Sequence, residues 1–257
     1  MQLDYYAECD YNYIRNKKQE VNKMKKGLGL MLVLLLACGL LVAGCGSNSG
    51  GEQTSDNQQE ANQETAQTAS VGELTKENPI TVNKEEGSIT FLGQVNGKYF
   101  YEPTRHAAVF VDGGNGDKAV FRGFVNHEDF YNALIEIGAK AGENMTLENK
   151  EQTHVEGDAF DITVTWTGAE KEVTIDEAIK DSNGTPIDIR FGGNLTNALD
   201  KKTGCLICLD SCPVGITSNA AYTYGAVEKT KEVGFTGNKD VLPADGTYVA
   251  ITMKLKK

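Results

Sequence analysis

Residues 160–167 read Phe-Asp-Ile-Thr-Val-Thr-Trp-Thr, so apolar and polar side chains alternate at every step. A period of two is typical of a β-strand that buries one face and exposes the other. The same pattern returns near the C-terminus, where the apolar positions are Val249, Ile251, Met253 and Leu255. These two segments predict a sheet with one hydrophobic face.

Two further groups of turn-forming residues separate short apolar segments. Asn96-Gly97 is a pair that favours a hairpin between two strands. The glycine cluster at 112–116 lacks the Lys-Ser/Thr ending of a phosphate loop, so it predicts a tight turn instead. The apolar segments beside these turns are residues 89–92, 99–101, 107–111 and 118–121.

One helix is predicted between the strands. Asn126 can cap its start and Gly138 can end it, with acidic residues in the first turn. A second, short helix is expected from Asp176 to about Asn183-Gly184. The fold class is therefore α+β: a single domain, mainly antiparallel sheet with one or two helices. The apolar face of the first helix consists of Phe130, Leu134 and Ile137.

The chain is acidic, with a formal net charge of −11 over 257 residues. A negative surface repels the phosphate backbone, so nucleic acid is excluded as a partner. The simplest explanation of the acidity is solubility outside the cell rather than a substrate site.

The first 45 residues predict export. Lys25-Lys26 precedes an uncharged, mostly apolar run at 27–44, which ends in small residues before Cys45. A transmembrane anchor is the alternative, but the run is at the lower limit of a spanning length and contains four glycines. The ending Val-Ala-Gly-Cys at 42–45 resembles the lipobox of bacterial lipoproteins. That resemblance implies lipidation of Cys45, which becomes the new N-terminus.

We therefore expect residues 1–44 to be a signal peptide. Its polar extension at 1–23 is unusual, and we expect the true start to be Met24. The protein would be anchored by lipid to the outer face of the cytoplasmic membrane, or to the periplasmic side of the envelope. Residues 45–78 are rich in Ser, Gly, Gln, Asn, Glu and Thr, so they predict a flexible linker in front of a globular domain at 79–257.

Three cysteines lie together near the end of the domain. Cys205, Cys208 and Cys212 have the spacing C-x2-C-x3-C-P. A bacterial ferredoxin segment has the spacing C-x2-C-x2-C-x3-C-P, and Lys202 stands where its first cysteine would be. An iron–sulfur cluster would therefore lack a ligand from this segment.

Two other hypotheses explain the same cysteines. An exported protein forms disulfides readily, and a disulfide predicts fewer than three free thiols. A metal such as zinc or copper would use the three thiolates and a fourth ligand from elsewhere. His106 is the best candidate for that ligand because it precedes an apolar strand. His127 starts a helix beside acidic residues, so we expect it to be exposed.

The chain resembles the YdjY-domain family of bacterial lipoproteins and ferredoxin-like proteins, from about residue 87 to 255. The resemblance implies the domain boundary, and the family's ferredoxin-like label belongs to the cysteine segment. It implies no settled activity. The matching segments are residues 118–123, 133–140, 164–166, 190–194, 203–213 and 218–220.

Two function classes remain open. The first is a membrane-anchored extracytoplasmic protein that acts in redox chemistry or metal handling through its cysteine cluster, with a redox or envelope protein as partner. The second is a non-catalytic surface binding module whose cysteines are structural. Neither a G-x-S-x-G nor an H-E-x-x-H motif is present, so the sequence favours a protein that is not a hydrolytic enzyme.

Overall fold

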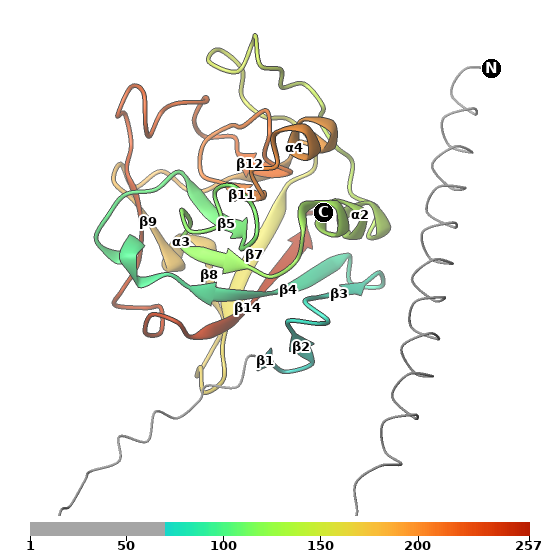
Figure 1. Ribbon diagram of the computed structural model, residues 1–257, viewed down its shortest axis with the longest axis vertical. Coiled ribbons are helices and arrows are strands. Elements are labelled where there is room, and N and C mark those ends of the chain that lie inside the picture. Colours follow the sequence, from blue (N-terminus) through green and yellow to red (C-terminus); the bar gives the residue numbers. More distant parts are fainter. Residues whose placement is uncertain (1–69) are drawn as a thin grey trace, which may run out of the picture. The chain divides into compact units, whose positions relative to one another are not determined.

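The computed structural model describes residues 70–257, whose regular structure is mostly β-strand (Figure 1). The helices are the 3₁₀ helix η1 (Gly97–Phe100) and the α-helices α2 (His127–Glu136), α3 (Ile175–Ala178) and α4 (Leu195–Lys201). The strands are β1 (Ser70–Val71), β2 (Leu74–Thr75), β3 (Ile80–Asn83), β4 (Ser88–Val95), β5 (His106–Phe110), β6 (Phe121–Gly123), β7 (Phe160–Thr165), β8 (Val173–Thr174), β9 (Ile179–Asp181), β10 (Ile189–Phe191), β11 (Cys205–Cys208), β12 (Thr217–Asn219), β13 (Phe235–Gly237) and β14 (Tyr248–Leu255).

Ten strands form one sheet in the order β10-β12-β11-β5-β6-β4-β14-β7-β8, with β3 also paired to β4. Its pairs are antiparallel except for β11–β12 and β5–β6. The sheet curls, since β10 at one end of the order comes close to β7 near the other end. An isolated bridge joins Ala159, just before β7, to Arg190 on β10. The fold is thus the expected α+β domain with a mainly antiparallel sheet.

The three longest strands, β4, β14 and β7, lie side by side in the sheet and form the main apolar part of it, called the centre below. Met253 of β14 lies between Ile89 on one side and Ile162 on the other. All three side chains are buried, whereas Asp161 is exposed. The alternation in residues 160–165 and 249–255 predicted a sheet with one hydrophobic face, and this prediction is confirmed.

The prediction of a hairpin at Asn96-Gly97 is wrong. The chain after β4 forms η1 instead of a returning strand. The Gly97 amide donates a hydrogen bond of 2.8 Å to Asp245 Oδ1, a residue almost 150 positions later. The side chain of Tyr99 is buried in this turn and donates to the Asp117 carbonyl. A distant acceptor and burial of Tyr99 thus determine the local conformation.

The glycine cluster at 112–116 does form turns, but β5 and β6 on its two sides pair in parallel rather than as a hairpin. The connection between them leaves the sheet and returns. Gly113 explains the shape of this loop, since a Cβ there would lie only 2.6 Å from Gly204 Cα. The loop therefore packs backbone to backbone against the segment that precedes Cys205.

Helix α2 follows the prediction closely. Asn126 accepts a hydrogen bond from the Asp129 amide at the start, and Gly138 has a φ of 87° just beyond the end. The predicted second helix shrinks to the single turn α3, which ends where β9 begins. Helix α4 was not expected, so the domain has three α-helices among its described residues rather than one or two. The buried positions on α2 include Phe130 and Leu134, as predicted.

The described part begins inside the expected linker. Strands β1 and β2 form a small hairpin, and Leu74 is buried against Leu92 and Ala250 on the sheet. This apolar contact explains why the fold begins before residue 79. The predicted signal peptide at 1–44 and Cys45 lie outside the described residues. Among residues 70–257, no helix is both long and apolar enough to cross a membrane.

Candidate metal centre

The site lies where β5 and β11 pair, between β12 and β6 in the sheet order. His106 opens β5, and its register partner is Cys208 at the end of β11. In a regular strand, residues three apart point to opposite faces. Irregularities on both sides of Ile207 shift the register of β11. Such a bulge re-aims side chains, so that Cys205 and Cys208 reach the same side of the strand.

His106, Cys205 and Cys208 thus converge. The Nδ1 atom of His106 is 3.8 Å from the Sγ atoms of Cys205 and Cys208. All three donor atoms lie within 4.8 Å of one another. The side chains are buried, with residue exposures of 5%, 1% and 0%. The structure therefore brings together His106 and two of the three cysteines that the sequence predicted for the site.

The two nearest thiols differ in acidity because each affects the other. A hydrogen bond from Cys208, helped by His106 against the effect of burial, holds the pKa of Cys205 well below its usual value. The same bond, contact with Cys212 and burial raise the pKa of Cys208 well above its usual value. The two shifts run in opposite directions, so Cys205 is the more acidic thiol of the pair and Cys208 the less acidic one.

Cys212 belongs to the same apolar cluster but is displaced toward Cys208. It is not among the three donors that lie mutually within 4.8 Å. Its loop is fixed by amides from the start of α4: Asn194 donates to the carbonyls of Cys212 and Gly215, each at 3.0 Å. All three cysteines are free thiols in the described chain.

Two comparisons with known proteins bear on this domain. The family model described as "YdjY domain" matches residues 80–254. This chain belongs to the YdjY family. A relative from Escherichia coli (strain K12), described as "Uncharacterized protein YdjY", is 55% identical over 182 residues, covering 71% of this chain and 81% of the relative. No solved structure matches the chain.

A buried ion pair adjoins the cysteines of the YdjY domain. Arg105 donates to Asp210 Oδ1 from Nε at 3.0 Å and also from its terminal Nη2, and Asp210 accepts from the Gly225 amide at 2.8 Å. The guanidinium lies 4.3 Å from the ring centre of Tyr224. Burial lowers the pKa of Arg105, but Asp210, Cys212 and Cys208 outweigh it and raise the pKa overall. A fixed positive charge therefore faces the thiols.

The loop formed by the glycine cluster at 112–116 packs beside Cys205. Amides of Gly114 and Asn115 donate to the carbonyls of Lys202 and Thr203. This docking places the Asn115 side-chain amide 3.7 Å from Cys205 Sγ, as a donor to the sulfur. The sequence marked the loop as a turn but gave no sign that it supports the cysteines.

The expectation that His127 is exposed is wrong. Its ring is half-buried at the start of α2, a helix that contacts β11. Its Nδ1 atom is fully buried and has no hydrogen-bond partner, and the same is true of Thr203 Oγ1. Burial lowers the pKa of His127, while Glu128 and Cys205 act in the opposite direction. The third histidine, His154, is exposed and bonds the Ala220 carbonyl, away from the site.

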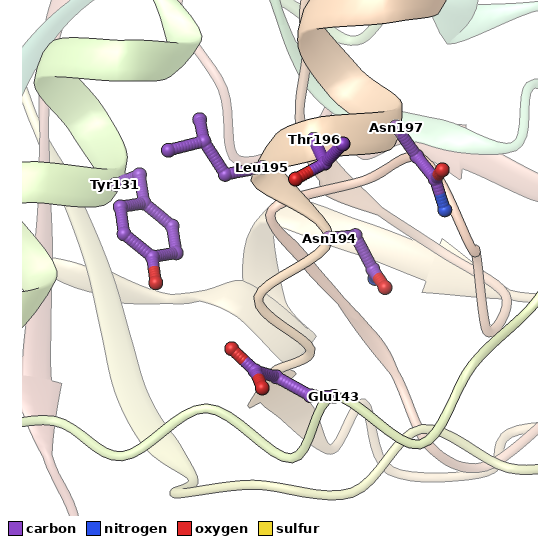
Figure 2. Close-up of a pocket in the computed structure, with 6 residues that line it drawn as sticks. All are labelled: Tyr131, Glu143, Asn194, Leu195, Thr196 and Asn197. Atoms are coloured by element: carbon purple, nitrogen blue, oxygen red, sulfur yellow. The ribbon is translucent and has the colours of Figure 1, made fainter. Parts of the chain in front are cut away.

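A hollow of about 340 Å³ lies on the other side of the Cys212 loop, between α2, α4 and the chain at Glu143. Figure 2 shows the Glu143 carboxylate and the Tyr131 hydroxyl pointing into it. Glu143 and Asn194 both have positive φ, at 51° and 54°. The hollow contains no thiol, and Asn194 separates it from the loop carbonyls to which it donates.

Proposed function

We propose that the YdjY domain holds a single thiophilic metal ion through His106, Cys205 and Cys208. The observation that carries the proposal is the convergence of one imidazole nitrogen on two sulfurs, at 3.8 Å from each. Ligands at about 2.0–2.3 Å from a tetrahedral ion lie roughly 3.5–3.8 Å from one another. The three donors therefore need to move little to share one ion.

The donor set favours zinc. Two thiolates and one imidazole suit a borderline-soft divalent ion, and three protein ligands of the type Cys2His occur in zinc enzymes that keep a fourth position open. A [4Fe–4S] cluster is less favoured, because each of its cysteines binds a different iron atom and must lie farther apart than ligands of one ion. The family's ferredoxin-like label would then describe the cysteine spacing and not the cofactor.

The buried charges support a metal centre as well. Two thiolates and a divalent ion sum to zero, and the neighbouring Arg105–Asp210 pair is neutral as a unit. No charge is therefore left uncompensated in the buried site, which would otherwise be costly. Asn115 and Arg105 supply donors and positive charge to the sulfurs from outside the ligand set.

The test is a metal titration of the full-length chain, reduced and stripped with a chelator. One Zn²⁺ or Co²⁺ per chain should bind, and Co²⁺ should give thiolate-to-metal charge-transfer absorption. Cys208→Ser should abolish stoichiometric binding at micromolar metal. Cys212→Ser is the matched control, which should keep the stoichiometry. Failure of the wild-type chain to bind either ion would contradict the proposal.

A dithiol that exchanges with disulfides is the second candidate. It is favoured by the contact between Cys208 and Cys212 next to the positive charge of Arg105. Thiol counting by mass spectrometry after purification without reductant separates the two functions. Among Cys205, Cys208 and Cys212, a metal centre predicts three free thiols after denaturation, whereas a Cys208–Cys212 disulfide predicts one.

We also propose that the chain is exported and anchored by lipid on Cys45, with the domain outside the cytoplasmic membrane. The support is the lipobox-like ending Val-Ala-Gly-Cys at 42–45 behind a basic and apolar leader. Cys45→Ser should abolish incorporation of labelled fatty acid. A Cys45→Ser chain that is still labelled and processed normally would contradict the anchor.

A further inference from the structure

We propose that the hollow between α2, α4 and the chain at Glu143 binds a small organic ammonium ion that carries hydroxyl groups, such as an amino sugar. This site is separate from the candidate metal centre, and the inference does not depend on a metal being bound there. It gives the domain a second, reversible ligand.

The hollow is large enough for such a molecule. Its volume is about 340 Å³, which lies in the range of small-molecule sites. The Tyr131 hydroxyl and the Glu143 carboxylate point into it, and Leu195 adds an apolar surface (Figure 2). The remaining lining residues are Asn194, Thr196 and Asn197. A bare metal ion would leave most of this space to water.

The walls of the hollow are held in place by the fold. The amides of Gly142 and Glu143 donate to the carbonyls of Phe191 and Gly192, at 2.9 Å and 3.0 Å. The Tyr131 ring packs against the Phe191 ring, with centroids 5.3 Å apart. Glu143 also has a left-handed backbone conformation, with a φ of 51°. Strained residues of this kind persist where their surroundings fix them and cluster at ligand sites, so the geometry favours a preformed site.

The amide side chains on the α4 side are partly used by the Cys212 loop. Asn194 donates from Nδ2 to the carbonyls of Cys212 and Gly215, and Asn197 donates to the Pro213 carbonyl at 2.9 Å. An amide group has only two N–H donors. Since both donors of Asn194 are engaged, its side-chain oxygen is what remains for a ligand.

The chemistry of the lining favours a cation with several hydrogen-bond donors. Glu143 is the charged residue among the described residues that line the hollow, and no lysine or arginine is among them. Its carboxylate and the Asn194 oxygen can only accept hydrogen bonds, whereas the hydroxyls of Tyr131 and Thr196 can accept or donate. An ammonium group would pair with the carboxylate, and hydroxyl groups would donate to the other oxygens. An anionic ligand would meet the carboxylate with no positive side chain to offset it.

A ligand can reach the hollow without a change of fold. Glu143 and Thr196 are exposed, and Tyr131, Asn194 and Asn197 are partly buried. The charged group therefore lies at the open side, where a solvated cation arrives first. Leu195 and the Tyr131 ring would contact the less polar face of the ligand.

The test is a ligand-observed NMR titration of the full-length chain with glucosamine, in the absence of metal ions. Glucosamine should bind saturably. Glucose, which lacks the ammonium group, should bind about tenfold more weakly, because hydrogen bonds to charged groups are the stronger ones. Glu143→Gln should weaken glucosamine binding by a similar factor. Glu156→Gln changes an exposed carboxylate outside the lining and is the matched control, with unchanged affinity.

Three results would overturn the inference: no saturable binding of glucosamine, equal affinities for glucosamine and glucose, or a wild-type affinity in Glu143→Gln. Tyr131→Phe keeps the ring against Phe191 and removes only the hydroxyl, so it should weaken binding by a smaller factor. If Glu143→Gln does not fold, Tyr131→Phe and the comparison of the two sugars decide. Each of these results leaves the proposed metal centre untouched, because the titration contains no metal ion.

Discussion

Two regions of the same sheet are built in different ways. The centre, formed by β4, β14 and β7, is a set of long antiparallel strands whose inward side chains are apolar. The cysteine region, formed by β5, β11 and β12, has short strands and buries many polar groups. Those buried polar residues are Arg105, His106, Asp210, Ser211, Thr217, Ser218 and Asn219.

The polar groups of the cysteine region are paired one by one. Thr217 donates to the Leu206 carbonyl at 2.9 Å, and Asn219 donates to the Leu209 carbonyl at 3.1 Å. The Ser218 hydroxyl accepts from the Cys212 amide at 3.2 Å. Such a network contributes less net stability than apolar burial but specifies one geometry. The centre therefore holds the domain together, while the cysteine region fixes its donors in place.

If this division is right, damage to the centre should affect stability and spare the metal site. Phe91→Ala removes a fully buried ring that packs edge-on against Phe130 at 5.4 Å. We expect a loss of about 3–5 kcal/mol in the free energy of unfolding, measured by urea denaturation. The remaining folded chain should bind Co²⁺ with wild-type stoichiometry. Ile135→Ala, at an exposed apolar position on α2, is the control and should cost far less.

Breaking the buried ion pair of the cysteine region should also lower the free energy of unfolding. Asp210→Ala leaves the Arg105 guanidinium buried without its partner, which should cost about 3 kcal/mol in unfolding free energy. The double change Arg105→Met with Asp210→Leu removes both charges and should recover most of that loss. Equal stability of the single and double variants in urea would show that the pair is not the source of the effect.

The raised pKa of Cys208 should make metal affinity depend on pH, which is a smaller and graded effect. Because Cys208 keeps its proton in the metal-free site, an incoming ion must displace that proton. Metal affinity should therefore rise about tenfold per pH unit, or about 1.4 kcal/mol, as long as the pH stays below the raised pKa of Cys208. Calorimetry in buffers of different ionisation enthalpy should detect about one proton released per ion. An affinity that does not change with pH would contradict the raised pKa of Cys208.

Much of the centre could be predicted from the sequence because its signals are local. The alternation of apolar and polar residues predicted β7 and β14. Asn126 and Gly138 predicted the two ends of α2. Prediction from the sequence failed where a residue far along the chain determines the local conformation. Asn96-Gly97 has the composition of a hairpin turn, but Asp245 accepts the Gly97 amide and favours a 3₁₀ turn.

The site could be predicted only in part for the same reason. The cysteine spacing and the position of His106 before a strand were visible in the sequence. The register irregularity that turns Cys205 and Cys208 to one side was not, because it depends on pairing with β5 about 100 residues earlier. His127 was misjudged because its acidic neighbours, Glu128 and Asp129, are exposed while the Nδ1 atom of its own ring is buried.

The central claim is that one metal ion is bound by two sulfurs and an imidazole. X-ray absorption at the zinc edge of the zinc-loaded, full-length chain counts these ligands directly. We expect two sulfurs at about 2.3 Å and two lighter atoms at about 2.0–2.1 Å, one of them from His106. A shell of three or four sulfurs would place Cys212 among the ligands and close the site, and a shell without sulfur would contradict the claim altogether.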